Sequence, residues 1–348
     1  MQHGRIPTGI CLEIEKLQRD FIWGDNENQR RMHHINWKTL CAPKHDGGLG
    51  LRKLKSMNDA FLLKILWQLK ERPNTLCLKV ISYKYCNGNI HTAQPTARSS
   101  DSPLWKELVK LWPTYKENTI CIIGNDLSTN FWLDPWVEGT ANLLSETMQN
   151  TTDLESTVWE WTDNEGNWDN NKLKRFLLDE VVHKITATLS PAEEHGDDRI
   201  GWRHSENENF MVGATYKALE NWSEPEQNNW SKLWKWEDPQ KAKTFMWQVM
   251  HGRILTNQRK ARMFGGLESC QICNGQIEDI VHALRNCPKV SRVWINLIKS
   301  ENAQIFFGTN NLQEWIHINF NNNLGANQNV NWIDMFNIAC WSFWKWRN

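Results

Sequence analysis

Residues 270–288 read CQICNGQIEDIVHALRNCP, and this stretch decides how the surrounding region folds. Two cysteines separated by two residues form a tight turn with both sulfurs facing one centre, and Gly275 is expected to let the chain leave that turn. Residues 278–286 are expected to form a short helix that carries the histidine. Pro288 is expected to stop this helix, because proline cannot continue a helix. The candidate metal ligands are Cys270, Cys273, His282 and Cys287.

Three thiolates and one imidazole are a donor set that Zn²⁺ takes in structural sites. Because all four positions come from the protein, none remains for water, and the zinc is expected to be structural rather than catalytic. The competing interpretation is that the four residues do not share a metal. Among them Cys287 is the ligand that the spacing defines least, because four intervening residues allow its side chain to point away. His33 and His34 are adjacent, but no cysteine partners lie close to them, so no second metal site is predicted.

The composition is that of a globular protein, with 40% apolar and 23% charged residues among 348, a length that suggests two or three domains. We find no apolar signal segment and no run of membrane-spanning length, so an intracellular protein, nuclear or cytoplasmic and not secreted, is expected. The nine cysteines are then expected to be reduced. Most of the 22 tryptophans are expected to pack in cores, with base stacking on a few exposed ones as the alternative.

Net charge is zero, but its distribution along the chain is uneven. Residues 134–198 hold fifteen acids and four bases, which favours a connecting region, whereas residues 239–267 hold six bases and no acid. Phosphate contacts need such a basic surface, so RNA or DNA is the expected partner; a solvated helix face is the alternative. Neither a membrane nor a small-molecule substrate is expected. The candidate nucleic-acid contacts are Lys241, Lys243, Arg253, Arg259, Lys260 and Arg262.

The hydrophobic pattern predicts a mainly α fold with short β hairpins. It comprises a small CCHC zinc-stabilised helical domain and a helical N-terminal region. A strong helix is predicted over residues 56–70, and a hairpin is predicted between residues 119–123 and 129–133. One amphipathic helix is predicted near residues 172–182. Two basic helices, at about residues 240–250 and 257–264, are predicted to precede the cysteine cluster.

Residues 241–294 resemble the zinc-binding domain that follows the reverse transcriptase in plant LINE-type (non-LTR) retrotransposons. The matching stretches there are KTFMW at 243–247, HGR at 251–253, LT at 255–256, CQIC at 270–273, His282, CP at 287–288 and VW at 293–294. Further matches to the segment after that polymerase are FIWG at 21–24, Trp37, CAPK at 41–44, GGLG at 47–50, NDA at 58–60 and FWLDPW at 131–136.

The resemblance implies ancestry in an RNA-directed DNA polymerase, yet the Tyr-x-Asp-Asp carboxylates that such a polymerase needs do not occur in this sequence. The chain is expected to begin after that motif and to stop before the RNase H domain that follows in relatives. Both two-metal centres are then missing, so no catalytic residue and no enzymatic activity are expected.

Four segments are predicted from these patterns. Residues 1–115 resemble the thumb or connection region after a reverse transcriptase, and residues 116–199 hold a hairpin and an acidic connection. Residues 200–297 form the zinc-binding domain, and residues 298–348 a helical tail.

The sequence is compatible with three functions. The first is a non-catalytic, zinc-containing nucleic-acid-binding fragment of a retrotransposon polyprotein. The second is a structural or protein-interaction module, or a relic without nucleic-acid binding, with the polymerase or RNase H domains of related elements as partners. The third is a nuclease or polymerase that retains activity, which would need clustered carboxylates.

Overall fold

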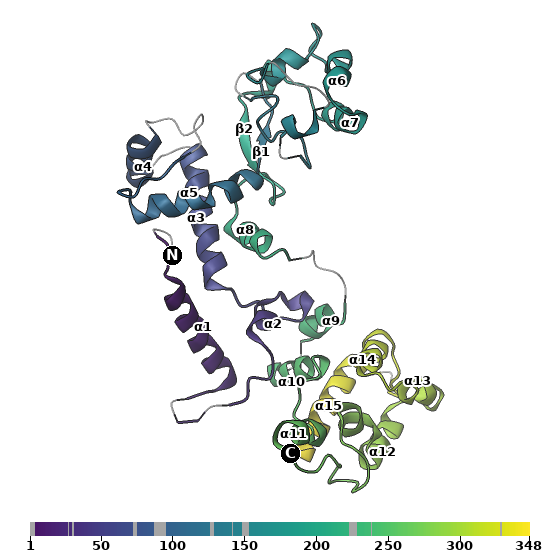
Figure 1. The fold of residues 1–348 in the computed structure, drawn as a ribbon. Helices are drawn as coiled ribbons and strands as arrows, with labels where there is room; N and C mark the ends of the chain where they lie inside the picture. Colours follow the sequence, from purple (N-terminus) through teal and green to yellow (C-terminus); the bar gives the residue numbers. More distant parts are fainter. Residues whose placement is uncertain are drawn as a thin grey trace. The chain divides into compact units, whose positions relative to one another are not determined.

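The computed structural model describes most of the chain (Figure 1). The residues that it describes are 4–26, 28–29, 31–71, 75–86, 95–125, 129–140, 142–147, 153–222, 228–237, 239–327 and 329–348. Within them the chain forms fifteen α-helices and one sheet of two strands, which confirms the mainly helical fold. Among these helices we find none that combines the length and the apolar character needed to cross a membrane.

Contacts divide the chain into two compact units, each built from two separate stretches of sequence. Unit 1 combines Met1–Glu13 with Lys53–Asn221, and unit 2 combines Ile14–Arg52 with Trp222–Asn348. Helix α1 (Thr8–Trp23) contributes residues to both units. The four segments predicted from the sequence stay a prediction.

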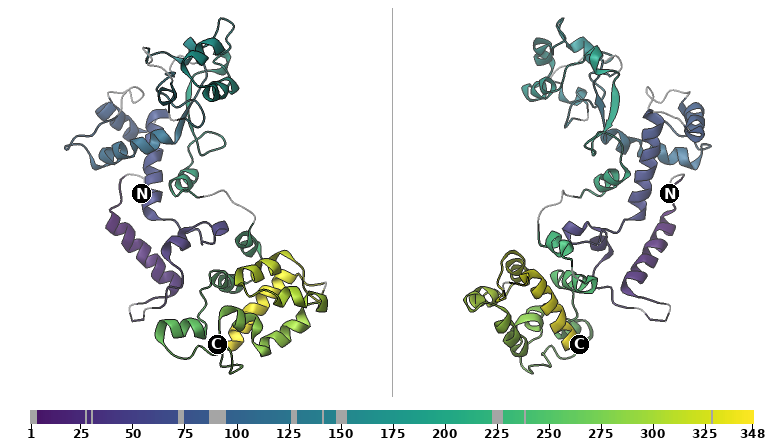
Figure 2. Two further views of the ribbon diagram at one scale, coloured as in Figure 1. Left: turned by 45° about the vertical axis from the view of Figure 1, so that its right-hand side comes forward. Right: turned by 180° about the vertical axis from the view of Figure 1, so that it is seen from behind.

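Four helices form the first core of unit 1, in which α3 contacts α4, α5 and α8 (Figure 2). The helix predicted over residues 56–70 is confirmed as α3, and its Leu63 and Leu66 are fully buried. Ser102 begins α5 by accepting a hydrogen bond from the Trp105 N–H, and Pro103 follows where its missing N–H costs nothing. These helices are α3 (Leu54–Glu71), α4 (Leu76–Cys86), α5 (Pro103–Glu117) and α8 (Val212–Leu219).

The sheet joins two distant parts of unit 1. Strand β1 (Thr119–Ile122) pairs antiparallel with β2 (Arg199–Trp202). The hairpin predicted between residues 119–123 and 129–133 is therefore wrong, because the partner strand comes from much further along the chain.

The side chain of Asp198, directly before β2, explains this pairing. Its carboxylate accepts hydrogen bonds from the Gly124 N–H at 2.9 Å and from the Thr129 N–H at 3.1 Å. These bonds hold the segment after β1 against the start of β2. The segment after Thr129 bridges to a third stretch instead of to β1: the Thr129 carbonyl accepts from the Val158 N–H at 3.2 Å, and the Phe131 N–H donates to the Ser156 carbonyl at 2.9 Å.

The second core of unit 1 is aromatic. The rings of Phe131 and Trp161 stack at 4.0 Å between centroids, and those of Trp136 and Trp168 stack at 5.5 Å. With the buried Trp132 these residues form the aromatic cluster.

Two short helices border the aromatic cluster where the sequence predicts one near residues 172–182. They are α6 (Asn170–Phe176) and α7 (Asp179–Ala187). The predicted single helix is wrong because Leu177 takes an extended conformation between them, which buries its side chain in the core.

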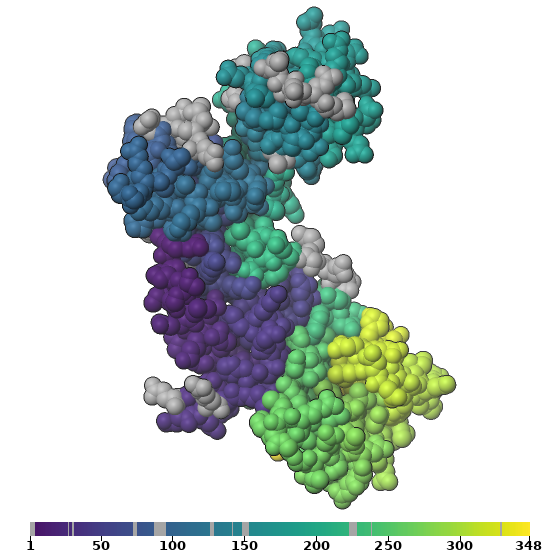
Figure 3. Space-filling model, in the orientation of Figure 1, coloured from purple at the N-terminus to yellow at the C-terminus, as the bar shows by residue number. Residues whose placement is uncertain are grey.

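Unit 2 is a helical body with a single large core. Figure 3 shows the outer surface of its C-terminal part in green to yellow. At its centre the fully buried Trp294 packs against the rings of Phe306 and Phe336, and its indole N–H donates to the Leu284 carbonyl at 2.8 Å. Helices α10 and α15 contact each other in this core. The helices are α2 (Trp37–Cys41), α9 (Asn229–Lys235), α10 (Gln240–Met250), α11 (Asn257–Phe264), α12 (Pro288–Leu297), α13 (Ala303–Phe307), α14 (Leu312–Asn321) and α15 (Trp332–Arg347).

The GGLG turn at residues 47–50 packs onto α10 within unit 2. The Gly47 carbonyl accepts hydrogen bonds from Trp247 Nε1 and His251 Nε2, each at 2.7 Å. Gly47 has a φ of 83°, and a Cβ there would lie 2.8 Å from the Trp230 ring, so only glycine fits. The turn is therefore a packing element, as its lack of a Gly-Lys-Ser/Thr sequel suggests.

Candidate metal centre and basic helices

The first cysteine pair lies on a closed turn. The Cys270 N–H donates to the Gln276 carbonyl at 2.8 Å, and the Asn274 N–H donates to the Cys270 carbonyl at 2.8 Å. The prediction that Gly275 lets the chain leave this turn is wrong, because the left-handed residue is Asn274, with a φ of 55°. Asparagine tolerates this conformation better than most residues, which explains the placement.

The other two candidate ligands are joined by a wide helical turn. His282–Asn286 is a π-helix, and the Cys287 N–H donates to the His282 carbonyl at 2.9 Å, five residues back. The helix expected over residues 278–286 is therefore shorter and wider than predicted. This wide turn of five residues brings the side chains of His282 and Cys287 to the same side of the chain, so Cys287 faces the other candidate ligands despite its spacing.

Pro288 has a different role from the one predicted. It occupies the first turn of α12, with Cys287 as the residue before the helix. Proline suits this position because the first helical N–H groups have no partner within the helix. Cys287 is thus fixed between two helical segments, and it is only 1% exposed.

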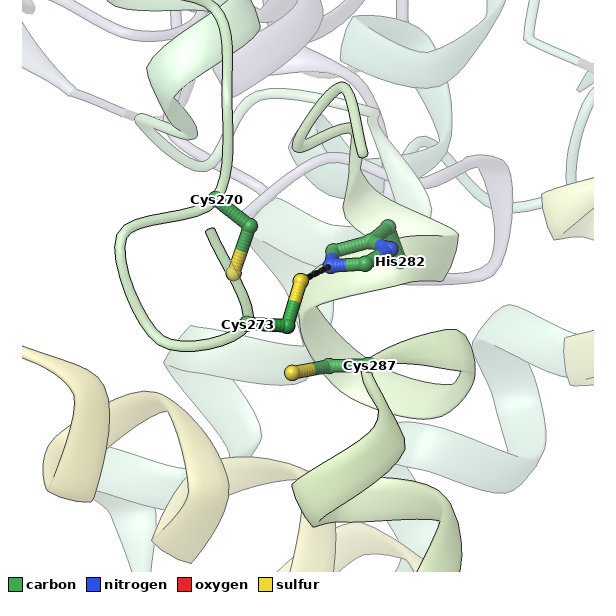
Figure 4. Close-up of side chains that lie close together, drawn as sticks. All are labelled: Cys270, Cys273, His282 and Cys287. Carbon is green, nitrogen blue, oxygen red and sulfur yellow. Dashed lines mark hydrogen bonds between the residues drawn. The ribbon is translucent and has the colours of Figure 1, made fainter. Parts of the chain in front are cut away.

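The structure brings the four candidate ligands together (Figure 4). All four ligand atoms lie within 4.8 Å of one another, and Cys273 Sγ lies 3.4 Å from His282 Nε2. Tetrahedral zinc with Zn–S of about 2.3 Å and Zn–N of about 2.0 Å would place sulfur and nitrogen about 3.5 Å apart. The donor set and its spacing therefore fit a zinc ion.

The surroundings of the site favour metal-binding forms of two ligands. His282 donates its Nδ1–H to Gln276 Oε1 at 3.1 Å, which leaves Nε2 facing the sulfurs. Burial lowers the pKa of His282, so the imidazole stays neutral near pH 7. The backbone N–H of Gln276 lowers the pKa of the Cys273 thiol, whereas burial raises that of Cys270.

A buried ion pair supports the loop between the ligands. Glu278, 1% exposed, accepts a hydrogen bond from Arg347 Nε at 2.6 Å and another from the Asn257 N–H at 2.7 Å. Arg347 belongs to α15, and Asn257 begins α11. One carboxylate therefore ties the metal loop to two helices. Arg347 and Glu278 are 69 residues apart in the sequence, so no local motif predicts their contact.

The candidate basic residues occupy two helices and the segment between them. Lys241 and Lys243 lie on α10, while the other four lie on or just before α11, none of whose residues is buried. Arg259 donates a hydrogen bond to the Arg253 carbonyl, so these two are neighbours. Lys241, Arg253 and Arg262 are exposed, and Lys243, Arg259 and Lys260 are half-buried.

A second cluster was not predicted. The ligand atoms of Asp20, Asp25 and His33 lie within 4.8 Å of one another, with His33 Nε2 2.9 Å from Asp25 Oδ2. Arg19 and Arg31 line the same depression, and the Arg31 backbone N–H donates to Asp25 Oδ1 at 2.7 Å. This hydrogen bond and the contact with His33 account for the position of Asp25 without a metal.

The region that contains the site matches a known family. Residues 210–294 match the family described as zinc-binding in reverse transcriptase. This region is therefore similar to reverse transcriptase zinc-binding domains. It contains all four candidate ligands and all six candidate basic residues. The match confirms the resemblance to a reverse transcriptase zinc-binding domain.

Two proteins of Arabidopsis thaliana are similar over longer stretches. One, named "Putative ribonuclease H protein", is 29% identical over 350 residues, which cover 98% of this chain and 56% of the relative. The other, an uncharacterized mitochondrial protein, is 26% identical over 136 residues, which cover 38% of this chain and 86% of that protein. The chain thus spans little more than half the length of the first relative.

Proposed function

We propose that the chain is a non-catalytic, zinc-containing nucleic-acid-binding part of a LINE-type retrotransposon reverse transcriptase. The observation that carries the proposal is the acid-free stretch of residues 239–267 inside the zinc-binding domain. It would act inside the cell on RNA or DNA, beside polymerase or RNase H domains of related elements.

The contacts of α11 connect the metal loop with the basic surface. Asn257 Nδ2 donates to the Ser269 carbonyl at 2.9 Å, and the Gln258 N–H donates to the Glu278 carbonyl at 3.2 Å. Ser269 directly precedes the first cysteine ligand. Order in the loop therefore fixes the start of α11 and presents its basic side chains in one orientation.

In this proposal the four side chains Cys270, Cys273, His282 and Cys287 hold a structural Zn²⁺. Bound zinc supplies a cross-link between the cysteine turn and the π-helix, and it leaves no position for a substrate. Gln276 orients the imidazole and Glu278 anchors the loop. The basic residues would then contact phosphates without regard to sequence.

Fluorescence anisotropy of the zinc-loaded chain with labelled single strands tests the proposal. We expect affinity to fall steeply between about 50 and 200 mM salt, because phosphate contacts release counterions. The variant K260E/R262E should weaken binding and flatten the salt dependence. The matched variant K174E/R175E, on the short helix α6 of the acid-rich region, should bind like the parent protein.

Binding without salt dependence, or equal losses in both charge variants, would contradict the proposal. The structural or protein-interaction alternative predicts no binding to RNA or DNA at all. Mg²⁺-dependent strand extension or RNA cleavage by the pure protein would show instead that it is an enzyme.

A further inference from the structure

An exposed aromatic residue ends the basic helix α11. Phe264 is 70% exposed, and its neighbours Met263 and Leu267 are 49% and 78% exposed. Among the described residues of the zinc-binding domain, every other Phe, Tyr or Trp is buried or half-buried. An apolar ring in water gains free energy when a partner covers it, so this position points to a ligand.

Helix geometry places the ring beside positive charge. Lys260 lies four residues before Phe264, so the two side chains share a face of α11, one turn apart. Arg262 is exposed on the same turn of the helix. The whole stretch of residues 239–267 contains no acid that would repel a polyanion.

The backbone after Phe264 leaves the approach to the ring open. Gly265 and Gly266 have φ angles of 77° and 113°, and a Cβ at either would meet nothing within 4 Å. Among the described residues no ring or cation is stacked on Phe264. A flat ligand can therefore reach it.

We propose that Phe264 stacks on an unpaired base of single-stranded nucleic acid whose backbone lies along Lys260 and Arg262. This inference rests on the proposed function and adds the strandedness of the ligand. Base faces are available for aromatic stacking in single strands, whereas a duplex covers them. The adjoining charge favours nucleic acid over an apolar protein surface.

The test compares zinc-loaded F264A, F264W and the parent protein by anisotropy, using a single strand, its duplex and the same strand with abasic sites. Loss of one base–aromatic stack should weaken single-strand binding by F264A about tenfold. Duplex affinity and salt dependence should stay unchanged. F264W should restore binding, and the abasic strand should bind both F264A and the parent equally weakly.

Controls separate the inference from the proposed function. W159A removes an exposed aromatic from the acidic region and should leave binding unchanged, and zinc content should be the same in all variants. If the parent shows salt-sensitive binding but F264A binds single strands equally well, the stacking inference is wrong and the proposed function stands. If the parent binds no nucleic acid, the proposed function fails first, and an F264A variant defective only in protein binding would assign the ring to a protein.

Discussion

The described parts of residues 129–185 and residues 265–280 both contain little long regular structure, yet they bury very different side chains. The first region buries the aromatic cluster, with rings as close as 4.0 Å. The second buries only Cys270 and Glu278, one candidate metal ligand and one member of an ion pair. An apolar core can order a loop-rich segment by itself, whereas a segment with almost no apolar burial needs a metal or an ionic anchor.

Among the tests of this difference between the two regions, loss of the metal should have the largest effect. C273S should lose zinc and unfold residues 265–287, because binding contributes on the order of 10 kcal/mol in small zinc domains. Hydrogen exchange should rise there and stay unchanged in residues 129–185. Zinc per chain, measured by mass spectrometry, should fall in C270S and C273S but not in the control C86S; unchanged zinc in both ligand variants would reject the assignment.

Truncation in the aromatic cluster is the converse experiment. Trp161→Ala removes the ring stacked on Phe131 and should cost about 3–5 kcal/mol, as large aromatic deletions do. Hydrogen exchange should increase within residues 129–185 while zinc content remains at the parent value. Loss of zinc in this variant would show that the two regions are not independently ordered.

The ionic anchor of the metal loop comes next in expected size. Arg347→Met leaves the buried Glu278 carboxylate without its cation and should destabilise unit 2 by about 3 kcal/mol. The double variant E278Q/R347M removes the charge as well and should recover most of the loss. Denaturant unfolding measures both, and equal stability of single and double variants would contradict a buried charge as the cause.

A pH effect should be the smallest. Burial, followed by Arg253, lowers the pKa of His251 below 6.5, although its hydrogen bond to Gly47 opposes the shift. The unfolded chain therefore takes up this proton first, so the contribution of His251 is fully present above pH 6.5 and is lost as pH falls through its lower folded value. The urea midpoint of unfolding should drop less between pH 7.5 and pH 5.5 in His251→Gln than in the parent. An equal drop in both proteins would show that His251 is not the source of this pH dependence.

The sequence predicts what depends on local spacing. The ligands Cys270, Cys273 and His282 follow from a short motif, and α3 follows from apolar residues that recur at helical spacing. It does not predict contacts made through distant side chains, such as the carboxylate of Asp198 that redirects β1, or Arg347 on Glu278. The sequence does not predict the left-handed conformation of Asn274, because the glycine next to it is the usual choice for such a conformation.

The π-helix also accommodates one extra residue between two candidate ligands without turning their side chains apart. Removing one residue between His282 and Cys287 would leave an ordinary α-turn, in which side chains four apart still share a face. The wide turn and the ordinary turn each make about one helical turn, so this deletion would roughly keep the direction in which the chain leaves the site. Because α12 begins directly after Cys287, Trp294 would then keep its place among the rings of Phe306 and Phe336, so the ligand pair and the core of unit 2 tolerate the same change.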